Sequence, residues 1–174
     1  MERAEGPYDA RAIANFILDE SDAAGFTMYP TSLLKILYFG HGWHLALFGG
    51  PLIAQPFEAW EHGPVVRVVY DQIKDYSGKA IKVRLKAFNP RSMTPKVASA
   101  EITRGGKSML RAVLGAYGSL HPYKLSEMTH ESGSPWTSVW EAAQIGASPG
   151  ARLNDGEIRD YFLRQNHADV LGIG

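Results

Sequence analysis

The 174 residues of the chain include no cysteine. The protein therefore cannot form disulfides, iron–sulfur clusters or zinc sites with thiolate ligands, and it has no cysteine nucleophile. Two other features are also missing. Residues 1–6 lack the apolar core of a signal peptide, and no apolar run reaches the roughly 18 residues of a membrane span. We expect a soluble, cytoplasmic protein with no membrane partner.

The sequence also lacks an excess of charge of either sign, because 18 Lys and Arg residues balance 18 Asp and Glu residues. A domain that binds a phosphate backbone normally carries a basic excess, so the composition disfavours nucleic acid as a partner. Hydrophobic residues make up 45% of the chain and charged residues 21%, which excludes disorder as the dominant state. At about 100 to 200 residues per domain, the length predicts one domain over residues 1–174.

Apolar residues at helical spacing predict a mainly helical chain. Helices are expected over 9–25, where Asp9 is the N-cap, and over 30–48. The second helix is apolar on most of its circumference, which is typical of a central helix. Gly40 and Gly42 lower its helix propensity, so we interpret them as sites where a neighbouring backbone or ring comes close. Further helices are predicted over 65–76, 103–120, 123–131, 134–143 and 154–165.

Two segments show the pattern of β-strands. Residues 52–60 are short and interrupted by Pro56, which permits an edge strand but not a central one. Residues 79–88 alternate between apolar and basic side chains, which predicts a half-buried strand with a basic solvent face. The basic positions are Lys82, Arg84 and Lys86. We expect these two segments to pair in a small antiparallel sheet inserted between the helices.

The segments that flank the predicted sheet complete the fold prediction. Pro64 follows Gly63 and occupies a natural first helical position, so the helix over 65–76 is expected to begin there. Residues 89–99 contain two prolines and no clear period, which predicts a loop of low order. Helices and strands do not alternate along the chain, so the fold class is α+β.

Two common catalytic motifs are incomplete or absent in this sequence. The run Gly105-Gly106-Lys107-Ser108 ends like a phosphate-binding loop, but Glu101 stands where that loop requires its first glycine. No Gly-x-Ser-x-Gly elbow is present to support a serine nucleophile. We predict no catalytic residue, no cofactor and a protein that is not an enzyme.

Three histidines near two carboxylates offer the ligand types of a metal site. They are His41, His44 and His62, with Glu58 and Glu61. Their spacing is not the His-Glu-x-x-His of zinc proteases, and a hydrogen-bonded core imidazole is the commoner role for His44 on its apolar helix face. We predict no metal site, and a metal-dependent hydrolase that uses the three histidines is the alternative function.

Large aromatic side chains are abundant for a core of this size. Core packing is their default role, and an aromatic groove at a protein interface is the alternative. The residues are Trp43, Trp60, Trp136 and Trp140, with Tyr38, Tyr70 and Phe57.

The basic stripe of residues 82–86, with Arg91 and Lys96 nearby, has a similar pair of interpretations. It is commonly a solvated strand face, and an acidic protein partner or nucleic acid is the alternative. Nucleic-acid binding would make the protein a regulator of its own operon, and only this stripe supports that third function.

Three blocks of sequence, in order along the chain, match a known pattern. The first is KILYFGHGWHL over 35–45, and the second is FEAWEHGPVV over 57–66. The third includes LSEMTH and SPW within 125–136. With these blocks, which extend over roughly residues 10–143, the chain resembles the SocA-like antitoxin family, also called the Panacea domain.

This resemblance implies an antitoxin of a bacterial toxin–antitoxin pair that neutralises its cognate toxin by direct protein binding. It also implies a role as a proteolytic adaptor, in which the antitoxin delivers the toxin to an AAA+ protease such as ClpXP. Both the toxin and a ClpXP-type protease are then expected partners.

The family motif supplies the expected scaffold or interface residues. They are Lys35, Tyr38, Trp43, His44, Glu58, Trp60, His62, Gly63, Pro64, Tyr70, Thr129, His130, Pro135 and Trp136. His41 departs from the pattern, in which we expect Gln.

Within this set, we expect Glu58, His62 and His130 to form a polar cluster around which Trp60 and Trp136 pack. Residues 79–101 match no part of the pattern, so we expect them to carry partner choice. Their candidate partner-facing residues are Lys82, Arg84 and Lys86.

Overall fold

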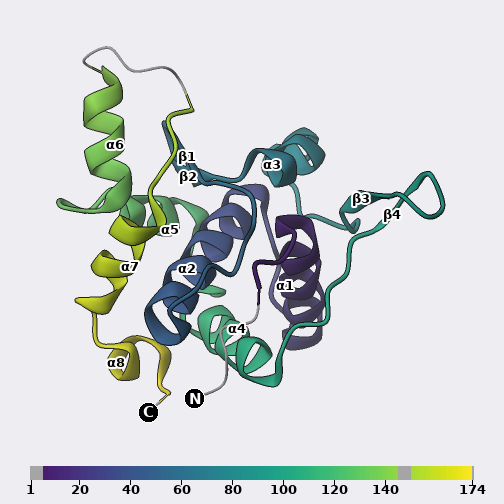
Figure 1. The fold of residues 1–174 in the computed structure, drawn as a ribbon, viewed down its shortest axis with the longest axis horizontal. Helices are drawn as coiled ribbons and strands as arrows, with labels where there is room; N and C mark the ends of the chain where they lie inside the picture. Colours follow the sequence, from purple (N-terminus) through teal and green to yellow (C-terminus); the bar gives the residue numbers. More distant parts are fainter. Residues whose placement is uncertain (1–5, 145–149, 174) are drawn as a thin grey trace.

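A computed structural model describes residues 6–144 and 150–173. The described chain is mainly helical, with two small antiparallel hairpins, which confirms the predicted α+β class. The helices surround α2, and the β3–β4 hairpin alone projects away from them (Figure 1). The helices are α1 (Ala10–Ala24), α2 (Pro30–Phe48), α3 (Arg67–Ile73), the 3-10 helix η1 (Lys74–Tyr76), α4 (Arg104–Tyr117), α5 (Pro122–Thr129), α6 (Pro135–Gln144), α7 (Asp155–Leu163) and α8 (His167–Leu171).

The first two helices begin and end where their sequence signals predict. Asp9 accepts a hydrogen bond from the backbone N–H of Arg11 at 2.8 Å and caps α1, as expected. Pro30 occupies the first turn of α2, where its missing N–H costs nothing. Gly25 and Gly49 end the two helices with φ of 78° and 77°, a left-handed conformation that glycine adopts without strain.

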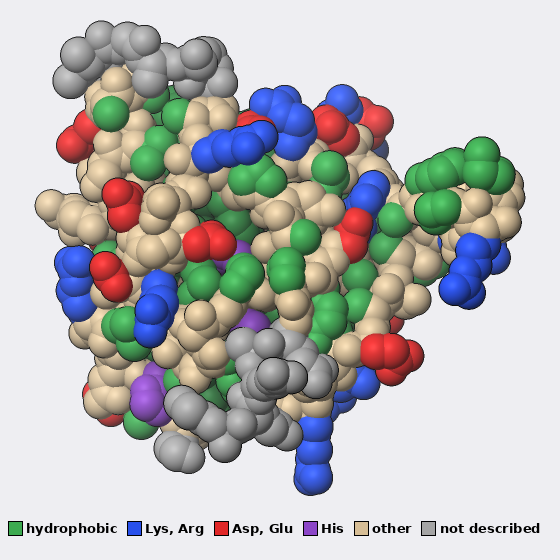
Figure 2. Space-filling model, in the orientation of Figure 1, with side chains coloured by type: hydrophobic (Ala, Val, Ile, Leu, Met, Phe, Trp, Pro, Cys, Tyr) green, Lys and Arg blue, Asp and Glu red, His purple; other side chains and the backbone are tan. Residues whose placement is uncertain are grey.

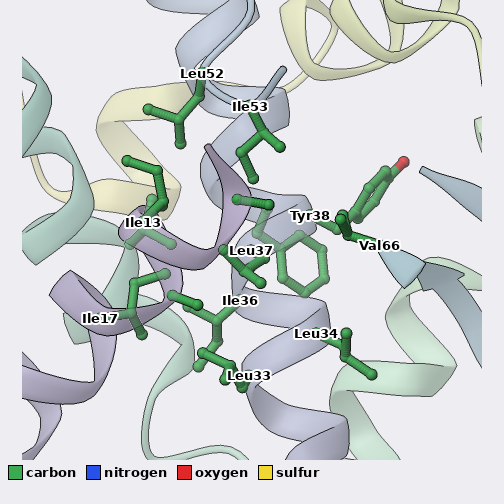
Figure 3. Close-up of a cluster of buried hydrophobic side chains, with 14 of the residues drawn as sticks. Ile13, Ile17, Leu33, Leu34, Ile36, Leu37, Tyr38, Leu52, Ile53 and Val66 are labelled. Carbon is green, nitrogen blue, oxygen red and sulfur yellow. The ribbon is translucent and has the colours of Figure 1, made fainter. Parts of the chain in front are cut away.

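Helix α2 lies in the centre of the molecule, and this prediction is confirmed. It packs against helices α1, α4, α5 and α7, and residues 32–45 are buried without interruption. Figure 3 shows Ile13 and Ile17 of α1 pointing toward Leu33, Ile36 and Leu37 of α2. These contacts form the main part of the hydrophobic core.

The two glycines of α2 are sites of close approach, also as predicted. A Cβ atom added at Gly42 would lie 2.2 Å from the Phe162 ring of α7, so only glycine admits the ring. A Cβ added at Gly40 would lie 3.1 Å from Leu110 of α4. Because glycine has no side chain, these two positions let the neighbouring helices α4 and α7 approach the backbone of α2.

The predicted sheet pairing was wrong, because each strand pairs with its own neighbour in sequence. Strand β1 (Glu58–Trp60) pairs with β2 (Gly63–Val65), and β3 (Lys86–Asn89) pairs with β4 (Thr94–Val97). Gly63 and Pro64 pair with Trp60 and Ala59, so Pro64 lies in a strand and α3 begins later, at Arg67. The predicted loop over 89–99 instead contains the turn and second strand of a hairpin.

Two other boundaries differ from the prediction. Residues 79–85 do not form a strand, and only the end of the predicted segment enters β3. The final predicted helix over 154–165 ends at Leu163, and the short helix α8, which had no sequence signal strong enough to be predicted, follows it. No helix among the described residues is both long and apolar enough to cross a lipid bilayer.

Candidate functional site

The β1–β2 hairpin lies where three helices meet, and each helix fixes one backbone carbonyl of the hairpin. The three carbonyls belong to every second residue along the turn, at positions 60, 62 and 64. Each accepts a hydrogen bond from a side chain. The pairs are Trp136 Nε1 of α6 to the Trp60 carbonyl at 2.7 Å, Ser126 Oγ of α5 to the His62 carbonyl, and Lys35 Nζ of α2 to the Pro64 carbonyl at 2.9 Å.

Gly63 lets the helices approach the turn this closely. A Cβ atom at this position would lie 2.5 Å from Thr129 Oγ1 and 2.7 Å from Lys35 Cε, closer than real Cβ contacts. Its φ of 110° is also a conformation that residues with side chains rarely adopt. Two independent constraints therefore require glycine here.

Lys35 places an ammonium group in the interior of the protein. Its side chain is 1% exposed, and burial lowers its pKa to about 7 because the charged form loses its hydration. Among the residues that the structure describes, no carboxylate lies within ion-pair distance of it. Lys35 is the only Asp, Glu, Lys or Arg between Asp22 and Glu58, and this isolation in an apolar helix is the sequence signal of its burial.

A stack of three rings covers one side of the hairpin. The His130 ring stacks on Trp136 with centroids 3.8 Å apart, and Trp136 stacks on Trp140 at 5.3 Å. Burial lowers the pKa of His130, and electrostatic repulsion from Lys35 and His62 lowers it further. The His130 Nε2 atom is buried and has no hydrogen-bond partner among the described residues.

An ion pair lies beside the Trp60 ring. Glu58 accepts hydrogen bonds from Trp60 Nε1 at 2.9 Å and from Arg67 Nη2 at 2.7 Å. The Arg67 guanidinium also lies over the Trp60 ring, 5.2 Å from its centroid, and Tyr70 meets that ring edge-on. The aromatic ring is thereby held between a cation and a phenol.

The hairpin tip separates two surface hollows. Glu61 and His62 are exposed at the tip. A hollow of about 390 Å³ lies beside His62 and is also lined by Ser126, His130 and Tyr123. A second hollow of about 310 Å³ lies beside Glu61 and is lined by Trp60, Arg67 and Trp140. Aromatic and charged side chains on a rigid backbone are typical of protein–protein interfaces.

The predicted cluster of Glu58, His62 and His130 does not form. Glu58 bonds to Trp60 and Arg67, whereas His130 stacks on Trp136, and the structure gives no hydrogen bond between any two of the three. The prediction was wrong because it treated the hairpin side chains as one group. His62 lies in the turn and lines one hollow with His130, whereas Glu58 lies at the start of β1 and bonds to Arg67.

The three histidines of the alternative metal site also lie apart. His41 bonds through Nε2 to Asp155 at 2.9 Å, and His44 bonds through Nδ1 to the Gly50 carbonyl at 2.7 Å. His44 is thus the hydrogen-bonded core imidazole that its helix face predicts, and burial lowers its pKa. Within residues 6–144 and 150–173, no three His, Asp or Glu side chains are grouped to hold a metal ion.

The remaining aromatic residues of the motif are part of the core. Trp43 is buried and donates from Nε1 to the Tyr117 hydroxyl at 3.0 Å. Tyr38 is buried against Phe57 and Phe162. Its hydroxyl has no partner among the described atoms, and burial raises its pKa. Of the predicted aromatic set, only Trp60, Tyr70 and Trp140 reach the surface in part.

The candidate partner-facing residues separate into two kinds. Arg84 is 24% exposed and forms ion pairs with Asp19 at 2.7 Å and Asp22 at 2.5 Å, both on α1. Lys82 and Lys86 are exposed. The two lysines are therefore accessible to a partner, whereas Arg84 links the segment before β3 to α1.

Comparisons with known proteins agree with the sequence motif. The sequence model of a family described as "Antitoxin SocA-like, Panacea domain" matches residues 33–137, more than half of the chain. A protein named Antitoxin SocA, from Caulobacter vibrioides (strain NA1000 / CB15N), is 32% identical over 157 residues. That alignment covers 90% of this chain and 84% of the relative. No solved structure matches the chain.

Proposed function

The chain belongs to the SocA-like, Panacea-domain antitoxin family, and from that membership we propose that it neutralises the toxin of a toxin–antitoxin pair by binding it directly. The carrying observation is the fixed β1–β2 hairpin. Its three helix-donated hydrogen bonds hold a surface rather than assemble a reaction centre. A preorganised surface loses little conformational entropy on binding, which favours a stable complex.

The motif side chains support a binding role rather than catalysis. Lys35, Ser126 and Trp136 each donate to a backbone carbonyl, and the hydroxyl and the indole thereby use their single donors. The hydrolase alternative requires His41, His44 and His62 to share one metal ion, but His41 and His44 are engaged with other groups. We therefore propose a protein without enzymatic activity.

Co-expression tests this function. The protein encoded beside this gene is produced alone and together with the chain, and growth is followed. We expect toxicity when that protein is alone, rescue by the chain, and one complex on size-exclusion chromatography. Persistent toxicity without a complex would contradict the proposal, and elemental analysis showing a stoichiometric transition metal would favour the hydrolase.

We extend the proposal to proteolytic delivery, in which the chain presents the bound toxin to a ClpXP-type protease. An adaptor must contact toxin and protease at once and therefore needs two separate surfaces. Two hollows lie beside the tip of β1–β2. The β1–β2 and β3–β4 hairpins lie on different parts of the molecule (Figure 1). The test is toxin half-life with purified protease: the chain should shorten it, whereas simple occlusion would lengthen it.

We also propose that the domain extends beyond residues 33–137. Ile13 and Ile17 of α1 and Phe162 of α7 are buried against α2, so the core would be open without them. This supports one domain over residues 1–174, with its motif-bearing part at 10–143. Removing either α1 or α7 should leave an insoluble or unfolded product.

A further inference from the structure

The β3–β4 hairpin exposes an apolar face. Phe88 pairs with Pro95 across the hairpin, and Lys86 pairs with Val97. Directly opposed residues, and residues two apart on one strand, point to the same side, so Phe88, Pro95 and Val97 share a face. Phe88 is 58% exposed and Val97 is 55% exposed. Figure 2 shows hydrophobic side chains gathered over the projecting hairpin.

The base of this hairpin is nevertheless anchored by a buried polar group. Asn15 of α1 donates from Nδ2 to the carbonyls of Leu85 and Ala98, both at 2.8 Å, and its Oδ1 accepts from the Leu85 N–H at 2.8 Å. Gln72 of α3 bonds to both backbone groups of Lys86. Two helices thus hold in place a hairpin whose own apolar face contributes almost nothing to the core.

A two-stranded hairpin is only marginally stable in water, and exposed apolar clusters of this kind commonly mark interaction sites. A hollow of about 460 Å³ beside the apolar face is lined by Phe88 and Val97 together with Arg91 and Lys96. The arrangement is an apolar centre with a basic edge, which is the usual plan of a protein interface.

The charge of the segment identifies the chemistry of its partner. Residues 77–100 contain six cations and no Asp or Glu, whereas the whole chain is neutral. Arg84 is neutralised by α1, and Lys86, Arg91 and Lys96 lie in the hairpin. A second copy would bring like charges together, which is unfavourable, and an acidic partner would complement them. The six are Lys79, Lys82, Arg84, Lys86, Arg91 and Lys96.

We propose that the apolar face of β3–β4 is the docking surface for an acidic patch with an apolar centre on the toxin, an assignment that rests on the proposed function. Phe88 and Val97 fill the centre of the contact, Lys86 lies opposite Val97 on the same face, and Arg91 and Lys96 line the adjoining hollow. The apolar contacts set the lifetime of the complex, and the cations set the rate of encounter.

Biosensor kinetics with the full chain and the purified product of the neighbouring toxin gene test this assignment. One variant combines Phe88→Ser and Val97→Ser, and a second combines Lys86→Glu, Arg91→Glu and Lys96→Glu. The control carries Leu163→Ser, Arg159→Glu and Arg164→Glu, because these residues, in α7 and at its C-cap, are also exposed. All variants should retain wild-type thermal unfolding, since exposed substitutions rarely disturb folding.

We expect the serine variant to weaken binding about 30-fold or more through faster dissociation. The glutamate variant should associate about tenfold or more slowly, with a weaker dependence on salt. The control should change binding less than about twofold.

Two outcomes overturn the docking surface in distinguishable ways. If the wild type binds the toxin and both hairpin variants bind equally well, the surface is wrong and the proposed function stands. If the wild type binds no toxin, the function fails and the docking surface fails with it. A dimer of the chain that the serine variant breaks, or an oligonucleotide shift that the glutamate variant abolishes, also overturns the assignment, because the occupant is then another molecule.

Discussion

The β1–β2 and β3–β4 hairpins are both short, antiparallel and two-stranded, yet they meet their surroundings in different ways. Side chains from three helices bond to the backbone of β1–β2. The β3–β4 hairpin is held only at its base, and its strands lie in solvent. The first hairpin therefore packs as part of the folded core. The second is held by the helices at its base but contributes little to the stability of the core.

This difference determines what a substitution in each hairpin can affect. A substitution in β1–β2 disturbs side chains on α2, α5 and α6 at once. A substitution on the exposed face of β3–β4 disturbs no helix, so it can change a binding surface without changing the fold. Paired substitutions in the two hairpins make this comparison measurable.

The largest difference is expected between Trp136→Ala and Phe88→Ala. Trp136 is buried, stacks on two rings and donates to the hairpin, so its removal should lower the free energy of unfolding by about 3 to 5 kcal/mol. Phe88→Ala should change it by less than about 0.5 kcal/mol. Urea unfolding measures both, and equal losses would show that the two hairpins do not differ in this way.

A smaller effect is expected from adding one methyl group at each of two glycines. Gly63→Ala introduces a clash with Thr129 and a strained φ, which together should cost about 3 kcal/mol. Gly78→Ala is the matched control, because Gly78 has φ of 83° but open space around its Cβ position. It should lose only about 1 kcal/mol of backbone strain. A Gly63→Ala protein as stable as the control would mean that the helices do not close on the turn.

Lys35 gives β1–β2 a pH dependence that the other hairpin lacks. Its pKa is about 7 in the folded protein and 10.5 ordinarily, so between these values the unfolded chain binds a proton that the folded chain does not. Stability should therefore rise with pH, by about 2 kcal/mol from pH 7 to pH 9. Below pH 7 both states are protonated and the contribution is constant. Lys35→Met should remove this slope and the exposed control Lys82→Met should keep it, as followed by urea unfolding at each pH. A wild type without the slope would contradict the burial of the charge.

The smallest expected difference lies within the basic segment itself. Arg84→Ala breaks two ion pairs to α1 and should cost about 1 kcal/mol, because exposed pairs are weak. Lys86→Ala should change stability by less than about 0.5 kcal/mol. Thermal unfolding at low and high salt distinguishes them, since salt should reduce the Arg84 effect. A salt-independent loss would assign Arg84 a packing role instead.

Most helices could be predicted because their signals are local. Asp9 and Asn154 are caps that can be read within three residues, and the apolar circumference of residues 30–48 indicates a central helix without knowledge of its neighbours. Gly42 was correctly interpreted as a close approach, although the sequence could not identify Phe162 as the approaching ring.

The hairpins and the site could be predicted only in part, because they depend on contacts between distant segments. Gly63 and Pro64 resemble a helix start until α2 and α5 are placed beside them. Strand β4 contains Pro95, which lowers its strand propensity and is tolerated because a two-stranded hairpin has only edge strands. The separation of Glu58, which bonds to Arg67, from His130, which stacks on Trp136, depends on how the turn and the helices are placed in space.

The anchoring of β3–β4 has a consequence for how the protein can change. Asn15 binds Leu85 and Ala98 together, and the Ala98 N–H donates to the Leu85 carbonyl at 2.9 Å. The chain therefore leaves the helical body and returns to it at a single point. Residues between these two positions can be lengthened, shortened or exchanged at a cost that grows only slowly with loop length. The segment between the two junction residues can therefore vary in length and sequence while α1, α2 and the core stay as they are.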